Sequence, residues 1–181
     1  LLPHKRGMTS PKKQKHLGDR ELIVMMAAIM ALNALAIDAM LPAFPRMASG
    51  LGVADANSIQ HVITSYLLGM GAGSLLHGPL SDRFGRRPIL LTAIGGYILC
   101  ALACSFATSF EMLIAMRVAQ GLCGAALGVL VTSIIRDQFE GDAMARRMST
   151  IFLVFMAVPI VAPLVGSAVL LLAGWRTIFD L

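Results

Sequence analysis

Residues 58–106 read SIQHVITSYLLGMGAGSLLHGPLSDRFGRRPILLTAIGGYILCALACSF, and this stretch decides the fold. Two apolar runs, residues 58–80 and 89–106, flank a short turn that carries three arginines and one aspartate. A helix needs about 20 apolar residues to cross the hydrocarbon core of a bilayer. Both runs fall within the usual range around that length, so the stretch predicts two antiparallel membrane-spanning helices joined by a tight turn.

Apolar runs of the same kind continue on both sides of this stretch. The expected spans are Leu22–Leu41, Ser58–Leu80, Ile89–Phe106, Met112–Ile135 and Met148–Ala173, with the start of a sixth at Trp175. Hydrophobic residues make up 57% of the chain and charged residues 14%, against about 45–50% and about 25% in soluble domains. Backbone groups in lipid must be satisfied within their own segment, which favours helices. We therefore predict an all-α, polytopic transmembrane bundle.

Basic residues concentrate on alternate loops. With the N-terminus in the cytoplasm, the inner segments hold twelve (six in residues 1–20, three in 81–87, three in 136–147), whereas the outer loops hold Arg46 and Arg176. This division follows the positive-inside rule and predicts a cytoplasmic N-terminus. We expect a basic cytoplasmic tail at residues 1–20, attracted to anionic lipid rather than to nucleic acid, and a transmembrane bundle at 21–181.

Two charged residues, Asp38 and Arg117, lie inside expected spans, where each costs about 2.5–3.5 kcal/mol at mid-bilayer. Counted along the helices at about 1.5 Å per residue, they lie at similar depth in the outer half and could face one cavity. Gln120, one turn beyond Arg117, could line the same cavity. Because the proton affinity of a carboxylate depends on the local dielectric and on nearby cations, Asp38 is the candidate proton carrier. The alternatives are a static ion pair and an interfacial Asp38 that reaches water beside Pro42.

Pairs of small residues predict close helix crossings in the second and fourth spans. Gly69 and Gly73 are four residues apart, as are Gly124 and Gly128. This spacing places both members of a pair on one helix face, where a neighbouring helix can approach closely.

Two prolines, Pro159 and Pro163, lie in the middle of the fifth expected span, followed by Gly166. Each proline frees a backbone carbonyl and softens the helix. Bending during transport and simple tolerance of proline in a packed bundle both remain open.

The cysteines Cys100, Cys104 and Cys123 all lie within expected spans. Cys100 and Cys104 share a helix face, but no second pair or histidine cluster completes a metal site in the sequence. We therefore interpret the cysteines as apolar packing residues and expect neither a metal nor a cofactor.

The turn at residues 78–91 reads GPLSDRFGRRPILL. Gly85 permits a tight reversal, and Pro88 suits the first turn of the next helix. The turn resembles the signature loop of the major facilitator superfamily, which is a glycine, three positions, Asp-Arg, one position and Gly-Arg-Arg or Gly-Arg-Lys. The matching residues are Gly78, Asp82, Arg83, Gly85, Arg86 and Arg87.

Further segments resemble one branch of this superfamily, the Bcr/CflA-type drug-resistance transporters, whose members are drug:proton antiporters. These segments are Asp38–Pro45, Arg117–Gly121, Arg136–Asp142 and Gly174–Phe179. Met40 replaces a tyrosine that is usual in this branch. Residues 162–167 resemble the antiporter motif of the fifth helix, with Ser167 in place of its second glycine.

The resemblance runs from about residue 20 to the end and implies the N-terminal portion of a transporter with twelve spans in two six-helix bundles. The implied partners are the lipid bilayer, a small-molecule substrate and the missing C-terminal half; the implied location is the cell membrane, the inner membrane in bacteria. By the same resemblance, Arg117 takes part in proton coupling, Asp82 meets a helix of the missing half, and Arg86 pairs with Asp137.

The leading hypothesis is therefore proton-driven export of drug-like or small amphipathic molecules, with the proton as the coupling ion. An uptake or metabolite-exporting relative and a truncated, non-transporting remnant remain open. We do not expect an enzyme, because Ser74 and His77 lie on one helix without the sequence context of a catalytic dyad.

Overall fold

The computed structural model describes residues 18–53, 55 and 57–180, and these residues form helices and short connections without a strand. Residues 1–17 of the expected basic tail lie outside the described residues. The elements are α1 (Asp19–Asp38), η1 (Leu41–Ala43), α2 (Phe44–Gly50), η2 (Ser58–Gln60), α3 (His61–Phe84), α4 (Arg86–Ser105), α5 (Phe110–Gln138), α6 (Gly141–Leu172) and η3 (Arg176–Asp180). The predicted all-α class is confirmed.

Four segments of the described chain are long and apolar enough to cross a membrane. They are Arg20–Gly50, Arg86–Ser105, Phe110–Gln138 and Gly141–Leu172. The remaining expected span corresponds to α3, which is 24 residues long but less apolar, because it contains several glycines, serines and two histidines. The five complete spans and the cytoplasmic N-terminus therefore stay predictions.

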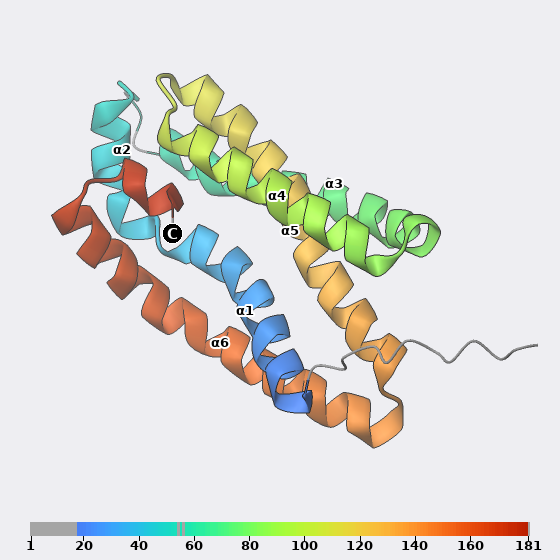
Figure 1. Cartoon of the computed structure of the whole chain (residues 1–181). Coiled ribbons are helices and arrows are strands. Elements are labelled where there is room, and N and C mark those ends of the chain that lie inside the picture. The colour runs from blue at the N-terminus through green and yellow to red at the C-terminus, as the bar shows by residue number, and fades with distance from the viewer. Residues whose placement is uncertain (1–17, 54, 56, 181) are drawn as a thin grey trace, which may run out of the picture.

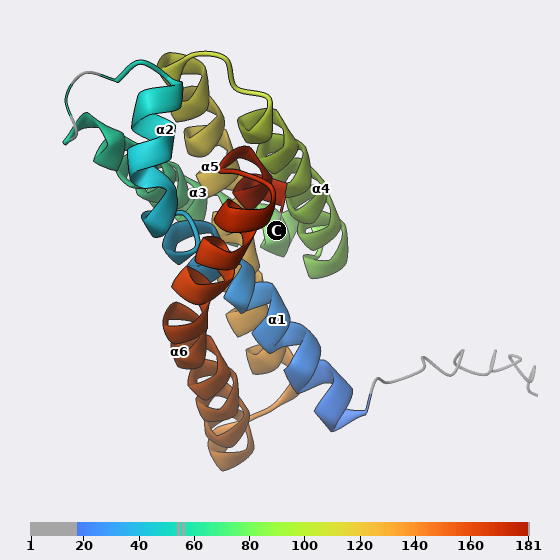
Figure 2. The same ribbon diagram turned by 90° about the vertical axis from the view of Figure 1, so that its left-hand side faces the viewer.

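The central helix of the bundle is α5. It packs along α3 and α4 and also contacts α1, while α1 and α6 lie side by side as a second group (Figure 1). The short helix η3 folds back against α4 (Figure 2). More than half of the apolar part of α5 is buried, whereas α6 is mostly exposed. An exposed apolar surface of that length suits lipid or a further part of a membrane protein.

Glycines let α3 and α5 cross with their backbones in contact. A methyl group at Gly69 or Gly73 would collide with the backbone of α5, and one at Gly121 would collide with the backbone of α3. The close crossing predicted at the first glycine pair is therefore confirmed. The prediction for Gly128 is wrong, because a methyl group there meets nothing within 4 Å. This part of α5 borders an open groove instead.

Gly85 alone separates α3 from α4. Its φ of 92° is a conformation that glycine adopts without steric cost, and its N–H donates to the carbonyl of Ser81 at 3.0 Å. The turn expected at residues 81–87 is shorter than predicted, because residues 81–84 complete the last turn of α3. The predicted tight reversal at Gly85 is present.

The helix α6 runs without interruption through Pro159 and Pro163. Gly166, one turn later, contacts the backbone of Ala39 just after the end of α1, and any side chain there would collide with that backbone. The prolines predicted to soften the fifth expected span, which is α6, therefore lie close to the contact between α6 and α1. Bending of α6 during transport stays a prediction.

Candidate functional site

The guanidinium of Arg117 connects three helices in the interior of the bundle. Arg117 lies on α5 and is 0% exposed. Its Nη1 donates to Gln120 Oε1 at 2.7 Å, its Nη2 to the carbonyl of Ala36 at 2.8 Å, and its Nε to the carbonyl of Val62 at 3.4 Å. The sulfur of Met40 lies 3.3 Å from Nη2. One side chain of α5 thus binds the backbones of α1 and α3 by charge-assisted hydrogen bonds.

Two aromatic rings contact the same guanidinium. The Cζ of Arg117 lies 4.7 Å from the ring centre of Tyr66 and 5.5 Å from that of Phe179 in η3. Aromatic faces attract a guanidinium within about 6 Å. No carboxylate forms an ion pair with Arg117 among the described residues, so carbonyl oxygens and rings surround the buried charge.

A cavity of about 260 Å³ adjoins Arg117. Apolar side chains of α1, α4 and η3 form most of its wall. The polar groups in the wall come from Arg117, Gln120, Tyr97 and Asp180. Gln120 and Arg117 thus line one cavity, and their part in proton coupling or substrate binding stays a prediction.

Asp38 does not line this cavity, so the expectation that Asp38 and Arg117 face one cavity is wrong. Asp38 is the last residue of α1 and is half-buried. Arg117 contacts Ala36 and Met40, two residues before and two after Asp38. At 3.6 residues per turn, Asp38 lies roughly opposite that contact face. Asp38 thus lies at the level of Arg117 along the bundle but points in another direction. No hydrogen bond or ion pair of the Asp38 carboxylate occurs within the described part of the chain.

A buried polar chain beside Arg117 could not be predicted from the sequence. The hydroxyl of Tyr66 donates to Asn33 Oδ1 at 2.6 Å, and Asn33 Nδ2 donates to the carbonyl of Gly124 at 3.1 Å. The hydroxyl of Tyr97 donates to the carbonyl of Leu32 at 3.2 Å. A polar side chain in lipid needs a partner on another helix, so the presence of Asn33 in a span indicates a contact of this kind. The sequence does not indicate which residue is the partner.

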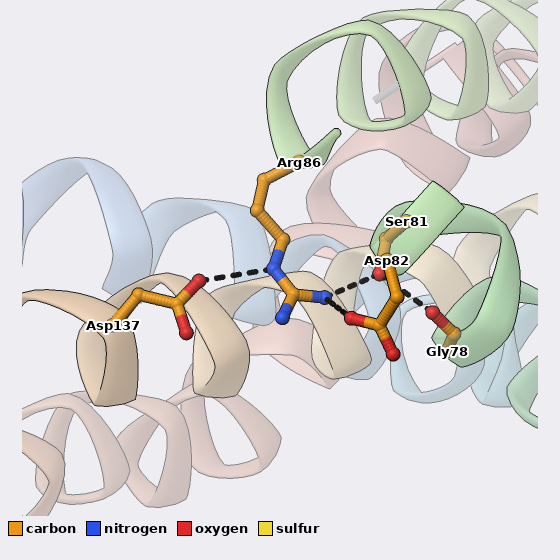
Figure 3. A network of polar contacts seen from close by, with 5 residues as sticks. All are labelled: Gly78, Ser81, Asp82, Arg86 and Asp137. Carbon is orange, nitrogen blue, oxygen red and sulfur yellow. Dashed lines mark hydrogen bonds and ion pairs between the residues drawn. The ribbon is translucent and has the colours of Figure 1, made fainter. Parts of the chain in front are cut away.

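A second polar centre lies where α3, α4 and α5 meet, around Arg86 (Figure 3). Arg86 Nη1 lies 2.8 Å from Asp82 Oδ1, and its Nε lies 3.0 Å from Asp137 Oδ2. Its Nη1 also donates to Ser81 Oγ, which in turn donates to the carbonyl of Gly78 at 2.8 Å. The pairing of Arg86 with Asp137 that the resemblance implied is therefore present.

The charges of this network are partly open to solvent. The side chain of Arg86 is 24% exposed, that of Asp82 68% and that of Asp137 48%. Ion pairs this exposed contribute roughly 0–1 kcal/mol each. The network therefore acts mainly by fixing the relative positions of three helix ends. The carboxylate of Asp82 stays largely exposed and is accessible to another partner.

The remaining residues of the signature loop do not converge on Arg86. Arg83 and Arg87 are exposed, and the guanidinium of Arg83 lies over the ring of Phe84 at 5.3 Å. An open groove of about 510 Å³ borders the network. Its lining residues are Gly78, Asp82, Arg86, Gly128, Val129, Thr132, Ser133 and Arg136.

Comparison with known proteins identifies the family. Residues 26–179 match the family described as Major Facilitator Superfamily. The chain is 38% identical to a bicyclomycin resistance protein homolog of Haemophilus influenzae over 157 residues. These residues make up 87% of this chain and 39% of the relative. It is 37% identical to the chloramphenicol resistance protein of Pseudomonas aeruginosa over 159 residues, and these residues make up 87% of this chain and 38% of the relative.

A third relative is Multidrug resistance protein D of Escherichia coli K12, with 30% identity over 168 residues, 93% of this chain and 42% of the relative. The chain thus spans about two fifths of the length of these relatives. The expected resemblance and the expected multi-pass location in the cell membrane are confirmed, and the family is one of transporters rather than enzymes. The matched region covers nearly all of the helical bundle, and this chain belongs to the Major Facilitator Superfamily.

Proposed function

We propose that this chain, together with a C-terminal six-helix half, exports drug-like or small amphipathic molecules in exchange for protons. The names of the similar proteins, which refer to bicyclomycin, chloramphenicol and multidrug resistance, support export of such compounds. A substrate cavity between two halves requires the second half, which is therefore a proposed partner beside the bilayer and the substrate.

In this proposal, α3 is also a membrane span, and the N-terminus lies in the cytoplasm. The Arg86 network supports this arrangement, because it joins the end of α3, the start of α4 and the end of α5. These three helix ends therefore lie on one side of the membrane. The arginines of the turn, which the positive-inside rule places in the cytoplasm, define that side.

Asp38 carries the proton in this mechanism. The observation that supports this role best is a half-buried carboxylate in a spanning segment that has no ion pair among the described residues. A carboxylate in that position must either be hydrated or be protonated, and a change in its surroundings changes which form is stable. Because Arg117 is held by other groups, Asp38 is not locked in a static pair.

The helix α6 couples this carboxylate to conformation. Gly166 of α6 touches the backbone of Ala39, which directly follows Asp38. If α6 bends at Pro159 or Pro163, the contact at Gly166 shifts and water gains or loses access to Asp38. Arg117 meanwhile holds α1 from the opposite side and keeps its position relative to α5.

The Arg86 network serves as a latch on the cytoplasmic side. Arg86 holds Asp82 and Asp137 together, and the exposed side of Asp82 is available to a helix of the second half. Conformations in which the halves meet on this side would therefore be stabilised by one further contact of Asp82.

The test is transport by the protein with its C-terminal half in inverted membrane vesicles with an imposed pH gradient. Chloramphenicol should accumulate inside the vesicles only while their lumen is acidic, and a protonophore should abolish the accumulation. Accumulation that is unchanged by the protonophore would overturn the proton coupling. Accumulation only with the opposite gradient would favour an uptake transporter.

A further inference from the structure

The side-chain amide of Gln120 carries a hydrogen-bond donor that the protein does not use. Gln120 is 2% exposed, and its Oε1 accepts from Arg117 Nη1 at 2.7 Å. Because a guanidinium can only donate, the atom that faces it is the amide oxygen, and the NH₂ group lies on the other side of the amide. No residue of the described chain accepts a hydrogen bond from Gln120 Nε2. A buried donor in this state is costly unless a bound molecule satisfies it.

This donor is open to the cavity of about 260 Å³ beside Arg117. Gln120 lines the cavity, and its Nε2 is not fully covered by protein atoms. The other donors in the wall are engaged. The hydroxyl of Tyr97 donates to the carbonyl of Leu32, and each nitrogen of Arg117 already donates to a protein oxygen. An ionised Asp180 can only accept, so Gln120 supplies the donor of this cavity.

The rest of the wall requires an apolar ligand body. Aliphatic and aromatic side chains of α1, α4 and η3 form most of it. Pockets that bury drug-sized ligands usually hold about 300–1,000 Å³, and this cavity is slightly smaller. The space therefore suits a molecule with one ring and a short substituent.

The two charged residues in the wall disfavour a charged ligand of either sign. An ion would lose its water in a mostly apolar cavity. A cation would lie close to Arg117, and an anion would lie close to Asp180. Arg117 also polarises the amide of Gln120 by donating to its oxygen, which strengthens the N–H groups as donors. The group that fits this donor is therefore a neutral oxygen acceptor.

We propose that this cavity binds small uncharged, mostly apolar molecules with one oxygen acceptor, such as a ketone, and that Gln120 Nε2 donates to that oxygen. The site lies within this chain. For its biological role the proposal rests on the proposed export of small amphipathic molecules, but binding requires neither a second half nor a pH gradient.

The test is a titration of the purified full chain in detergent, followed by fluorine NMR, with three probes that differ in one substituent. The probes are para-fluoroacetophenone, para-fluoroethylbenzene and para-fluorobenzoate. Displacement by excess acetophenone separates saturable binding from partition into micelles. We expect one ketone per chain, about tenfold weaker binding of the ethyl compound, which cannot accept a hydrogen bond, and no saturable binding of the benzoate.

Gln120→Glu tests the donor with little change of shape. Glutamate still accepts from Arg117, but its second oxygen replaces the NH₂ group, so the preference for the ketone over the ethyl compound should disappear. The matched control is Gln60→Glu, since Gln60 is exposed and lies outside the cavity wall; it should keep the tenfold preference. Circular dichroism checks that both variants are folded.

Three results would overturn the proposal. They are equal affinity of the wild type for the ketone and the ethyl compound, an unchanged preference in Gln120→Glu, and saturable binding of the benzoate that is tighter than that of the ketone. The first and third need no variant, so the proposal stays testable even if Gln120→Glu does not fold. Since no reading depends on transport, loss of this site and loss of proton-coupled export are distinguishable.

Discussion

Replacement of Arg117 by lysine tests how the centre of the bundle is held together. Lysine keeps the positive charge but loses the planar fork that donates in several directions and stacks on rings. In the structure, the fork reaches Gln120, Ala36 and Val62 and lies over Tyr66. A single ammonium cannot meet all of these partners in the same geometry.

The magnitude follows from the contacts that lysine loses. One of the charge-assisted hydrogen bonds is worth about 1.5–3 kcal/mol, and weakened stacking on two rings removes roughly 0.5–1 kcal/mol more. We therefore expect Arg117→Lys to lower the free energy of unfolding by about 2–4 kcal/mol. The desolvation cost of the charge is similar in both proteins, because lysine is also a cation, so it changes this difference little.

The assay is reversible unfolding of the purified chain in mixed micelles, followed by helical circular dichroism. Arg136→Lys is the matched control, because Arg136 lies on the same helix and is exposed; its effect should stay within about 0.5 kcal/mol. A double-mutant cycle with Gln120→Ala should show a coupling energy of about 0.5–3 kcal/mol. Equal stability of Arg117→Lys and the control would refute the view that this guanidinium holds α1 and α3 to α5.

Three further substitutions test separate contacts in the same unfolding assay. Gly69→Ala should lower the free energy of unfolding by several kcal/mol, since its methyl group meets the backbone of α5. The control Gly71→Ala, where a methyl group meets open space, should be neutral or stabilising by up to about 1 kcal/mol. Equal effects of the two substitutions would contradict the close crossing of α3 and α5. Tyr66→Phe removes the hydroxyl that donates to the side-chain amide of Asn33 in α1, so it should lower the free energy of unfolding by about 0.6–1.7 kcal/mol. An unchanged stability would contradict a contribution of this polar chain to the packing of the bundle. Asp137→Asn should cost less than about 1 kcal/mol, and the cost should shrink at high salt because the pair with Arg86 is exposed; a salt-independent loss would contradict a screened ion pair.

The approximate positions of the helices follow from features that are visible in one dimension. Apolar runs indicated where the helices lie, and Gly85 indicated the reversal between α3 and α4, since both depend only on neighbouring residues. The pairing of Arg86 with Asp137 joins residues far apart in the chain, and only the resemblance to a known family made it predictable.

The direction in which a side chain points could not be predicted in the same way. One residue rotates the direction by about 100° on a helix, so Asp38 lies at the level of Arg117 but on another face of α1. In a membrane bundle, lipid and neighbouring helices are both apolar, and hydrophobicity does not tell the two faces apart. For the same reason, neither the contact of Tyr66 with Asn33 nor the position of Gly128 beside an open groove could be predicted.

The most direct test of the central proposal measures two kinds of transport by Asp38→Asn in the protein with its C-terminal half. Accumulation driven by a pH gradient should be lost, whereas exchange of substrate across the membrane without a gradient should continue. The control Glu111→Gln removes an exposed acid from the first turn of α5 and should leave both activities intact. Accumulation at the wild-type rate in Asp38→Asn would contradict the proposal that Asp38 carries the proton.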